Sequence, residues 1–449
     1  MTALHTRNAL VALGIALCLA SPLAAREQKT VFHGMPVEPD TGLKRDAKIT
    51  PVNFERIWVF AGFTSPLAGD PVSTTPDVAA TDRSGQVVRI DAGTGTAVWT
   101  VELGEAAAVG PAIDFGTIYQ GTVSGTVVSI AVEDGTVHWR VAIGGAPLAP
   151  PVAMDGLIYV VTDAPELVVL APRDGAIVSR APLPGRPLPP VAGRGRVVVG
   201  TDRGIVTSFE RATLAVDWQR DLRHPVTSPP TLAGKRIFVG TADRAVWSLR
   251  AGSGRTSWRQ RTGSIVTVRP RALGGLLYIP CWDNDVYVLQ EHNGHLLGRA
   301  RLDHRLNTEV TSQPEHLFVA PFTEGIVVAL ALPYLGVAGR HELGVPGEWF
   351  STAPVSAAGG ITVGWGRDTG HLMALRVSPA PQSAKTPAAD QPVPTGSTTG
   401  SGAPSATTLP EAPAAPPVPP EPPAVPPVAP EKPPEPAGEQ PAPDVPPPV

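Results

Sequence analysis

The chain has 449 residues, which exceeds one ordinary hydrophobic core unless the chain is a repeat array. Its formal net charge of −4 excludes the strong overall field of a typical nucleic-acid or membrane-surface binder. The 53 prolines and 46 glycines predict much turn structure, a disordered part, or both.

Residues 1–25 have the pattern of an export signal. Arg7 provides a short positive region, an apolar run follows at 9–20, and Ala24 and Ala25 precede polar residues. The run is too short for a membrane anchor, which needs about 20 residues; the alternative is a buried helix. We therefore expect an exported protein of the bacterial periplasm or cell envelope, with no transmembrane helix after signal removal. Lipidation at Cys18 is not expected, because Leu17 stands where a small residue is needed.

After an N-terminal extension (26–51), residues 52–377 repeat with a spacing of 40 residues. Each unit contains two β-rich runs around a polar turn, then a glycine turn and a run that contains tryptophan in most units. Short β-branched runs bounded by Gly, Asp and Pro predict antiparallel strands. Four such strands in about 40 residues are typical of a propeller blade. We predict an all-β, eight-bladed β-propeller of four-stranded antiparallel blades, whose ring is closed by an N-terminal strand at 55–62.

The glycine turns and tryptophans are predicted to dock each blade on its neighbour. Positive φ is easily adopted by Gly, and Trp offers a large apolar face with one N–H. The predicted docking residues are Trp58, Gly95, Trp99, Gly135, Trp139, Trp218, Gly254 and Trp258.

The best-formed turn resembles the docking motif Ala-x-Asp-x-x-Thr-Gly-x-x-x-Trp of the pyrroloquinoline-quinone (PQQ)-type propeller family. Asp91, Thr94, Gly95 and Trp99 match this motif, and Arg89 stands in the place of Ala. The resemblance extends over about residues 52–377. It implies either a quinone- and calcium-dependent dehydrogenase or a non-enzymatic scaffold, similar to the propeller of the outer-membrane barrel-assembly machinery.

Few residues are candidates for chemistry. Asp283 and Asp285 flank Asn284 in a cluster that resembles calcium ligands but is also common in hairpin turns. Cys281 stands alone, whereas the alcohol dehydrogenases of the family carry a vicinal pair. His292, His295 and His304 form a weak metal candidate. Similar turns place Arg83, Arg203 and Arg244 on one propeller face, where they either bind an acidic peptide or sugar or are solvated.

Residues 378–449 contain no Phe, Trp, Tyr, Ile or Met and have a net charge of −5. Such a Pro/Ala/Glu-rich segment cannot bury enough apolar surface to offset its ordering entropy, so it is predicted to be disordered. It is either a solvated extension or a spacer that binds a Pro-reading or cell-wall partner.

The sequence favours a non-enzymatic protein-interaction scaffold of the cell envelope, with a role in outer-membrane protein assembly. No catalytic residue, metal or cofactor is expected, and no nucleic acid is an expected partner. The alternatives are a PQQ-dependent oxidoreductase that uses calcium, and a carbohydrate- or peptide-binding module.

Overall fold

A computed structural model of the chain describes residues 49–321, 325–333, 335–345, 347–357 and 360–380. These residues all belong to the first of two compact units, which spans residues 1–383. Their regular structure consists of β-strands, and no helix among them is long and apolar enough to cross a membrane. The predicted export signal and most of the Pro-rich tail lie outside the described residues.

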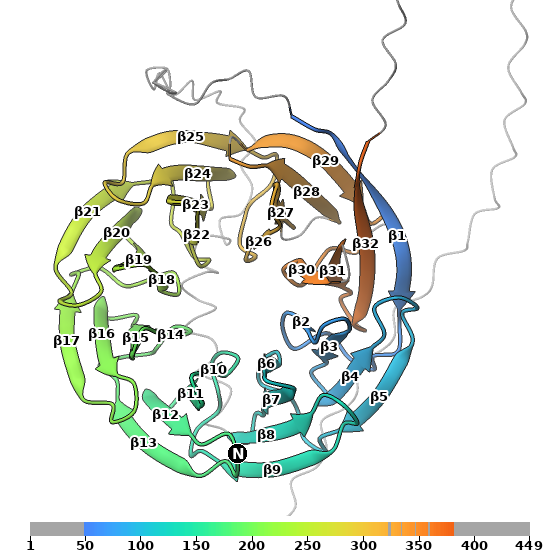
Figure 1. Cartoon of the computed structure of the whole chain (residues 1–449), viewed down its shortest axis with the longest axis horizontal. Helices are drawn as coiled ribbons and strands as arrows, with labels where there is room; N and C mark the ends of the chain where they lie inside the picture. Colours follow the sequence, from blue (N-terminus) through green and yellow to red (C-terminus); the bar gives the residue numbers. More distant parts are fainter. Residues whose placement is uncertain (1–48, 322–324, 334, 346, 358–359, 381–449) are drawn as a thin grey trace, which may run out of the picture. The chain divides into compact units, whose positions relative to one another are not determined.

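The strands form eight four-stranded antiparallel sheets, arranged as propeller blades around a centre (Figure 1). The predicted fold class is thereby confirmed. Blade 1 comprises β2 (Val72–Ser73), β3 (Val78–Thr81), β4 (Gln86–Ile90) and β5 (Ala97–Glu102). Blade 2 comprises β6 (Ala112–Asp114), β7 (Thr117–Gly121), β8 (Thr126–Ala131) and β9 (Val137–Ala142). Blade 3 comprises β10 (Val152–Met154), β11 (Leu157–Val161), β12 (Glu166–Leu170) and β13 (Ile177–Pro182). Blade 4 comprises β14 (Val191–Gly193), β15 (Arg196–Gly200), β16 (Ile205–Glu210) and β17 (Val216–Asp221).

The remaining four blades follow the same order from the centre outwards, with one exception in blade 8. Blade 5 comprises β18 (Thr231–Ala233), β19 (Arg236–Thr241), β20 (Ala245–Arg250) and β21 (Thr256–Arg261). Blade 6 comprises β22 (Arg271–Leu273), β23 (Leu276–Pro280), β24 (Asp285–Gln290) and β25 (Leu296–Arg301). Blade 7 comprises β26 (Thr311–Ser312), β27 (His316–Val319), β28 (Ile326–Ala331) and β29 (Gly336–Glu342). Blade 8 comprises β30 (Val355–Ala357), β31 (Gly360–Trp365), β32 (His371–Pro379) and, outermost, β1 (Val52–Phe60).

The ring is closed by pairing of the two ends of the propeller. Strand β1 runs antiparallel to β32, with Val52 opposite Pro379 and Phe60 opposite Leu372. The prediction placed this strand at 55–62. The observed strand β1 begins three residues earlier, at Val52, and ends two residues earlier, at Phe60. Closure protects the sheet edge that a three-stranded blade 8 would leave exposed.

The hydrophobic core lies between neighbouring blades. One buried cluster combines Tyr159 and Leu167 of blade 3 with Val197 and Val199 of blade 4. Equivalent clusters join blade 8 to blade 7 and to blade 1, so the core continues across the point of closure. Each blade buries its two faces only against its neighbours, which explains why every unit repeats the same short apolar strands.

The innermost strand of each blade lies nearest the centre of the ring (Figure 1), and in most blades proline precedes it. Seven of the eight blades have proline immediately before this strand, at positions 71, 111, 151, 190, 230, 270 and 354. Proline is suited to the start of an edge strand, because it has no N–H that would remain unpaired at the open edge of the sheet. These seven prolines of the propeller are explained in this way.

Each docking tryptophan contacts the outer turn of the following blade. The indole N–H of Trp58 donates to Ala92 O (2.8 Å), and that of Trp139 donates to Pro172 O (2.9 Å). Trp99, Trp218 and Trp258 donate in the same way to Val132, Ala251 and Glu291, at 2.8–3.0 Å. The indole rings cover the turn glycines, and a Cβ at Gly254 would lie 2.4 Å from Trp218. The turn therefore needs glycine both for its positive φ and for space.

Gly254→Ala should destabilise the propeller by about 2 kcal/mol, because φ is +63° and the new methyl group would displace Trp218. Gly252→Ala in the same turn is the matched control, since a Cβ there has no neighbour within 4 Å. Denaturant unfolding of the two variants provides the comparison. Equal stabilities would show that the indole–glycine contact does not constrain the turn.

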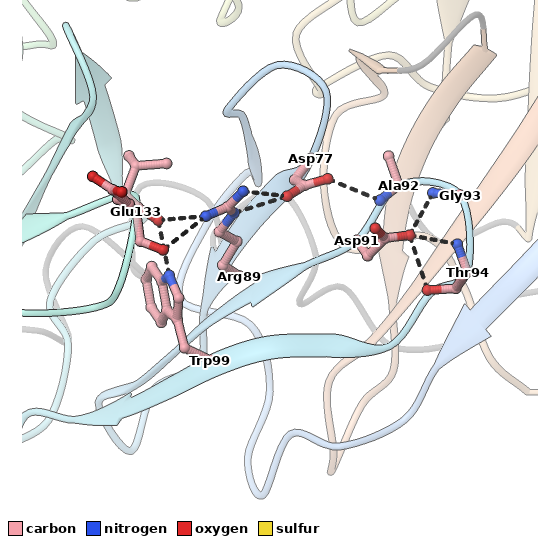
Figure 2. Close-up of polar contacts among 9 residues, drawn as sticks. Asp77, Arg89, Asp91, Ala92, Gly93, Thr94, Trp99 and Glu133 are labelled. Atoms are coloured by element: carbon pink, nitrogen blue, oxygen red, sulfur yellow. Dashed lines mark hydrogen bonds and ion pairs between the residues drawn. The ribbon is translucent and has the colours of Figure 1, made fainter.

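Arg89, which departs from the docking motif, also joins two blades (Figure 2). Its guanidinium forms an ion pair with Asp77 at 2.6 Å and donates to the carbonyls of Val132 and Glu133 in blade 2, at 2.8 and 3.0 Å. Asp77 is buried and accepts a further hydrogen bond from Ala92 N–H at 3.3 Å. The arginine thus links the core of blade 1 to the carbonyl that Trp99 also contacts.

Candidate interaction surfaces

The three arginines of the predicted binding ring lie in the turns between the second and third strands of blades 1, 4 and 5. Arg83, Arg203 and Arg244 are all exposed. Each turn is counted from the residue that forms an isolated β-bridge with the preceding loop, namely Asp82, Thr201 and Thr241. Arg83, Arg203 and Arg244 then stand at the second, third and fourth positions. Arg244 occupies the positive-φ position that Gly85 and Gly204 fill in blades 1 and 4. The turns are equivalent, but the side chains start from different places. The three arginines therefore do not occupy equivalent places around the ring.

The acidic cluster of blade 6 is engaged in local structural contacts. Tyr287 donates its hydroxyl to Asp283 at 2.5 Å, and Arg299 donates to Asp285 at 3.0 Å. The side-chain amide of Asn284 donates to Asp303 O at 3.3 Å. Burial raises the pKa of Asp285, and Arg299 opposes this rise.

These residues do not fit the calcium-dependent quinone centre of the dehydrogenases. Calcium takes six to eight oxygen ligands, whereas Asp285 Oδ1 is the one buried carboxylate oxygen of this cluster without a partner. Cys281 is buried, and burial raises the pKa of its thiol to about 11, which disfavours the reactive thiolate. Within the described ranges, no three His, Cys, Asp or Glu side chains are placed to hold a metal ion, and this includes His292, His295 and His304.

A small cavity of about 240 Å³ is lined by residues that include Asp70, Asn307 and Glu309. The carboxylate of Asp70 accepts a hydrogen bond from Ala353 N–H at 2.7 Å, which connects blades 1 and 8 at the inner end of the closure. Surrounding protein desolvates this carboxylate and raises the pKa of Asp70 to about 6, while the hydrogen bond opposes the rise. Asp70 nevertheless remains exposed to solvent.

Asp70 should make folding stability depend weakly on pH. Its pKa is higher in the folded protein than the ordinary value of 3.8, so the folded state holds the proton more tightly. Stability should therefore fall as the pH rises from 3.8 to about 6. Asp70→Asn retains an oxygen acceptor but cannot ionise, so its Tm should fall less across this range. A parallel pH dependence of Tm in both proteins would show that Asp70 does not contribute.

Charge is segregated around the propeller. Residues 61–182 (the acidic sector, blades 1–3) contain 5 Lys and Arg against 13 Asp and Glu, a net charge of −8. Residues 183–301 (the basic sector, blades 4–6) contain 18 Lys and Arg against 8 Asp and Glu, a net charge of +10. Two sectors of opposite sign create a field that steers and orients charged partners, although the total charge is small. The net charge of −4 of the whole chain does not reveal this segregation.

Eight compact blades joined by short turns define a protein of the PQQ-like propeller class. The family model described as "Outer membrane protein assembly factor BamB" matches residues 83–178 and 164–336, more than half of the chain. The chain belongs to this family. No curated protein matches the sequence.

Solved structures share the fold at low sequence identity. BamB from Moraxella catarrhalis has 17% identity and a TM-score of 0.59, over 72% of this chain and 100% of its own. The computationally designed protein Ika8 has 13% identity and a TM-score of 0.64, over 71% of this chain and 99% of its own. Quinohemoprotein alcohol dehydrogenase from Comamonas testosteroni has 12% identity and a TM-score of 0.58, over 72% and 76%. At such identities the likeness establishes the fold alone.

Proposed function

We propose that this protein is an exported, non-enzymatic scaffold of the bacterial cell envelope that binds protein partners during outer-membrane protein assembly. The family match supports this proposal, and the segregation of charge between the acidic and basic sectors is the observation that carries it. Oppositely charged sectors serve to orient partner proteins, whereas an enzyme needs catalytic groups that converge. The cluster at Asp283 and Asp285 is instead used for local contacts.

The test is removal of the protein from its bacterium, followed by measurement of folded barrel proteins in the outer membrane. We expect a lower amount of heat-modifiable barrel protein, restored by the full-length chain. Unchanged barrel-protein levels after removal would contradict the assembly role.

The basic sector is tested by charge reversal on its outer strands. Arg220 and Arg261 are exposed on β17 and β21, and neither forms an ion pair among the described residues. The combined change Arg220→Glu and Arg261→Glu should reduce complementation. The matched control reverses Arg83 and Arg173, two exposed arginines of the acidic sector, and should complement fully. Equal complementation by the two variants would exclude the basic sector as the partner surface.

A quinoprotein oxidoreductase is the second candidate, because a quinohemoprotein dehydrogenase shares the fold. The third candidate, a carbohydrate- or peptide-binding module, rests on Arg83, Arg203 and Arg244. Glycan binding that survives a triple alanine replacement of these arginines would exclude them as its basis.

A further inference from the structure

An open groove of about 800 Å³ lies in the basic sector. It lies where the inner turns of blades 4 and 5 meet the outer turns of blades 5 and 6, on the propeller face opposite Arg83 and Arg203. Six side chains that carry or can acquire a positive charge line this basic groove, namely Arg194, Arg196, Lys235, Arg236, Arg250 and His292. No acidic side chain is among its lining residues.

Most of these cations have no anionic partner. Arg196 lies 3.6 Å from Asp217, and Arg236 donates to the hydroxyl of Ser248 at 3.5 Å. The side chains of Arg194, Lys235 and Arg250 form no hydrogen bond or ion pair with any part of the chain that the structure describes. The carboxylate of Glu291 approaches the edge of the groove, 3.9 Å from where a Cβ of Gly234 would lie, without pairing with these cations.

Arg250 stands where blades 1 and 4 have an acid that stabilises the equivalent turn, and where blades 2, 3, 6 and 7 have the uncharged residues Ala131, Ala171, Gln290 and Ala331. In blade 1, Asp91 accepts hydrogen bonds from Gly93 N–H (3.0 Å), Thr94 N–H (2.7 Å) and the Thr94 hydroxyl (2.9 Å). Glu210 accepts the matching three bonds in blade 4. A guanidinium cannot accept a hydrogen bond. Blade 5 therefore lacks the acid that holds this turn and presents a cation instead.

Arg194 adds a second cation at the same groove, at a positive-φ position that Phe115 and Asp155 fill in blades 2 and 3. Its φ is +52° at the tip of the inner turn, where blades 5 and 6 have Gly234 and Gly274. Blade 3 has Asp155 at this place, and this carboxylate neutralises Arg211 of blade 4 at 2.6 Å. Between blades 4 and 5 the neutralising acid is absent, and Arg194 adds a cation.

We propose that the basic groove binds a multiply phosphorylated ligand. Several cations without partners in one groove need an anion of high charge density. A phosphate monoester carries a charge of about −1.5 to −2 and three acceptor oxygens, and arginine binds it through two parallel hydrogen bonds. A peptide delivers single carboxylates along an extended chain, and so neutralises a compact cluster less completely. The groove lies within the basic sector, at the turn before β21, whereas Arg220 and Arg261, which test the partner surface, lie near the opposite ends of β17 and β21.

Inorganic tripolyphosphate is the probe, titrated calorimetrically into the full chain lacking its export signal, at low ionic strength. We expect one bound tripolyphosphate per chain and weaker binding of citrate, a tricarboxylate anion of lower charge. Arg250→Asp should weaken tripolyphosphate binding by at least about tenfold. The matched control is Arg83→Asp on the opposite face, which makes the same change of charge and should bind like the wild type.

Arg250→Asp also restores the turn sequence of blade 1, apart from Ser253 in place of Thr94. Its Tm should therefore rise by about 1–2 °C, so loss of binding would not reflect unfolding. Sedimentation with phosphatidylethanolamine vesicles containing phosphatidic acid distinguishes a lipid headgroup from a soluble phosphate as the source. The proposal is overturned if tripolyphosphate does not bind, if citrate binds as tightly, or if the two aspartate variants bind alike. These outcomes do not bear on the barrel-protein test of the scaffold.

Discussion

A propeller that begins at residue 62 should not form a stable soluble monomer, whereas one that begins at residue 49 should. Removal of β1 exposes one edge of β32 and removes Trp58 and Val52, which are 7% exposed in the intact protein. Loss of one buried tryptophan alone costs about 3–5 kcal/mol. We expect the free energy of unfolding to fall by more than about 5 kcal/mol. Denaturant unfolding and size-exclusion chromatography of the two chains measure the effect.

The control for this truncation is a peptide of residues 49–61 added to the shortened chain. Because the exposed edge of β32 is its pairing surface, the peptide should bind and restore the cooperative unfolding transition. A shortened chain that unfolds like the longer one, without peptide, would contradict ring closure by β1.

Arg89→Ala should destabilise the protein by about 3 kcal/mol, although alanine is the residue of the family motif. The change leaves the carboxylate of Asp77 buried without its charge partner, and removes two hydrogen bonds to the turn of blade 2. Removal of one partner of a buried ion pair costs about 3–5 kcal/mol of stability. Arg89 is partly exposed, so we expect a loss at the lower end of this range. Chemical denaturation gives the magnitude.

The double variant Arg89→Ala with Asp77→Ala tests the cause of this loss. It removes the uncompensated charge, so it should be more stable than Arg89→Ala alone. If the two replacements are simply additive, the ion pair makes no specific contribution and the loss arises from packing.

The propeller could be predicted from sequence because its stabilising contacts repeat. The tryptophan of one blade contacts the outer turn of the next, 33 or 34 residues later, so the contact leaves a periodic trace in the sequence. The closing strand could be predicted for the same reason. Trp58, in the strand that precedes the first full repeat, lies in a sequence similar to that around Trp139, and both indoles form the same hydrogen bond.

The surfaces were harder to predict, because they depend on departures from the repeat. Arg83, Arg203 and Arg244 look alike in short turn sequences, but alignment of the strand pairing places them at different turn positions. The sequence alone does not single out Arg250 as a candidate. Its positive charge stands out only when its turn is compared with the turns of Asp91 and Glu210, whose carboxylates accept hydrogen bonds. The basic groove further requires that blades 4, 5 and 6 come together in space.

The central claim is that this propeller acts through its surfaces rather than through quinone chemistry. Its most direct test is titration of the purified chain with pyrroloquinoline quinone and calcium, monitored by the absorbance of bound quinone and by reduction of an artificial electron acceptor with alcohol and sugar substrates. We expect neither stoichiometric quinone binding nor substrate turnover. Stoichiometric binding of the quinone together with substrate-dependent dye reduction would contradict this claim.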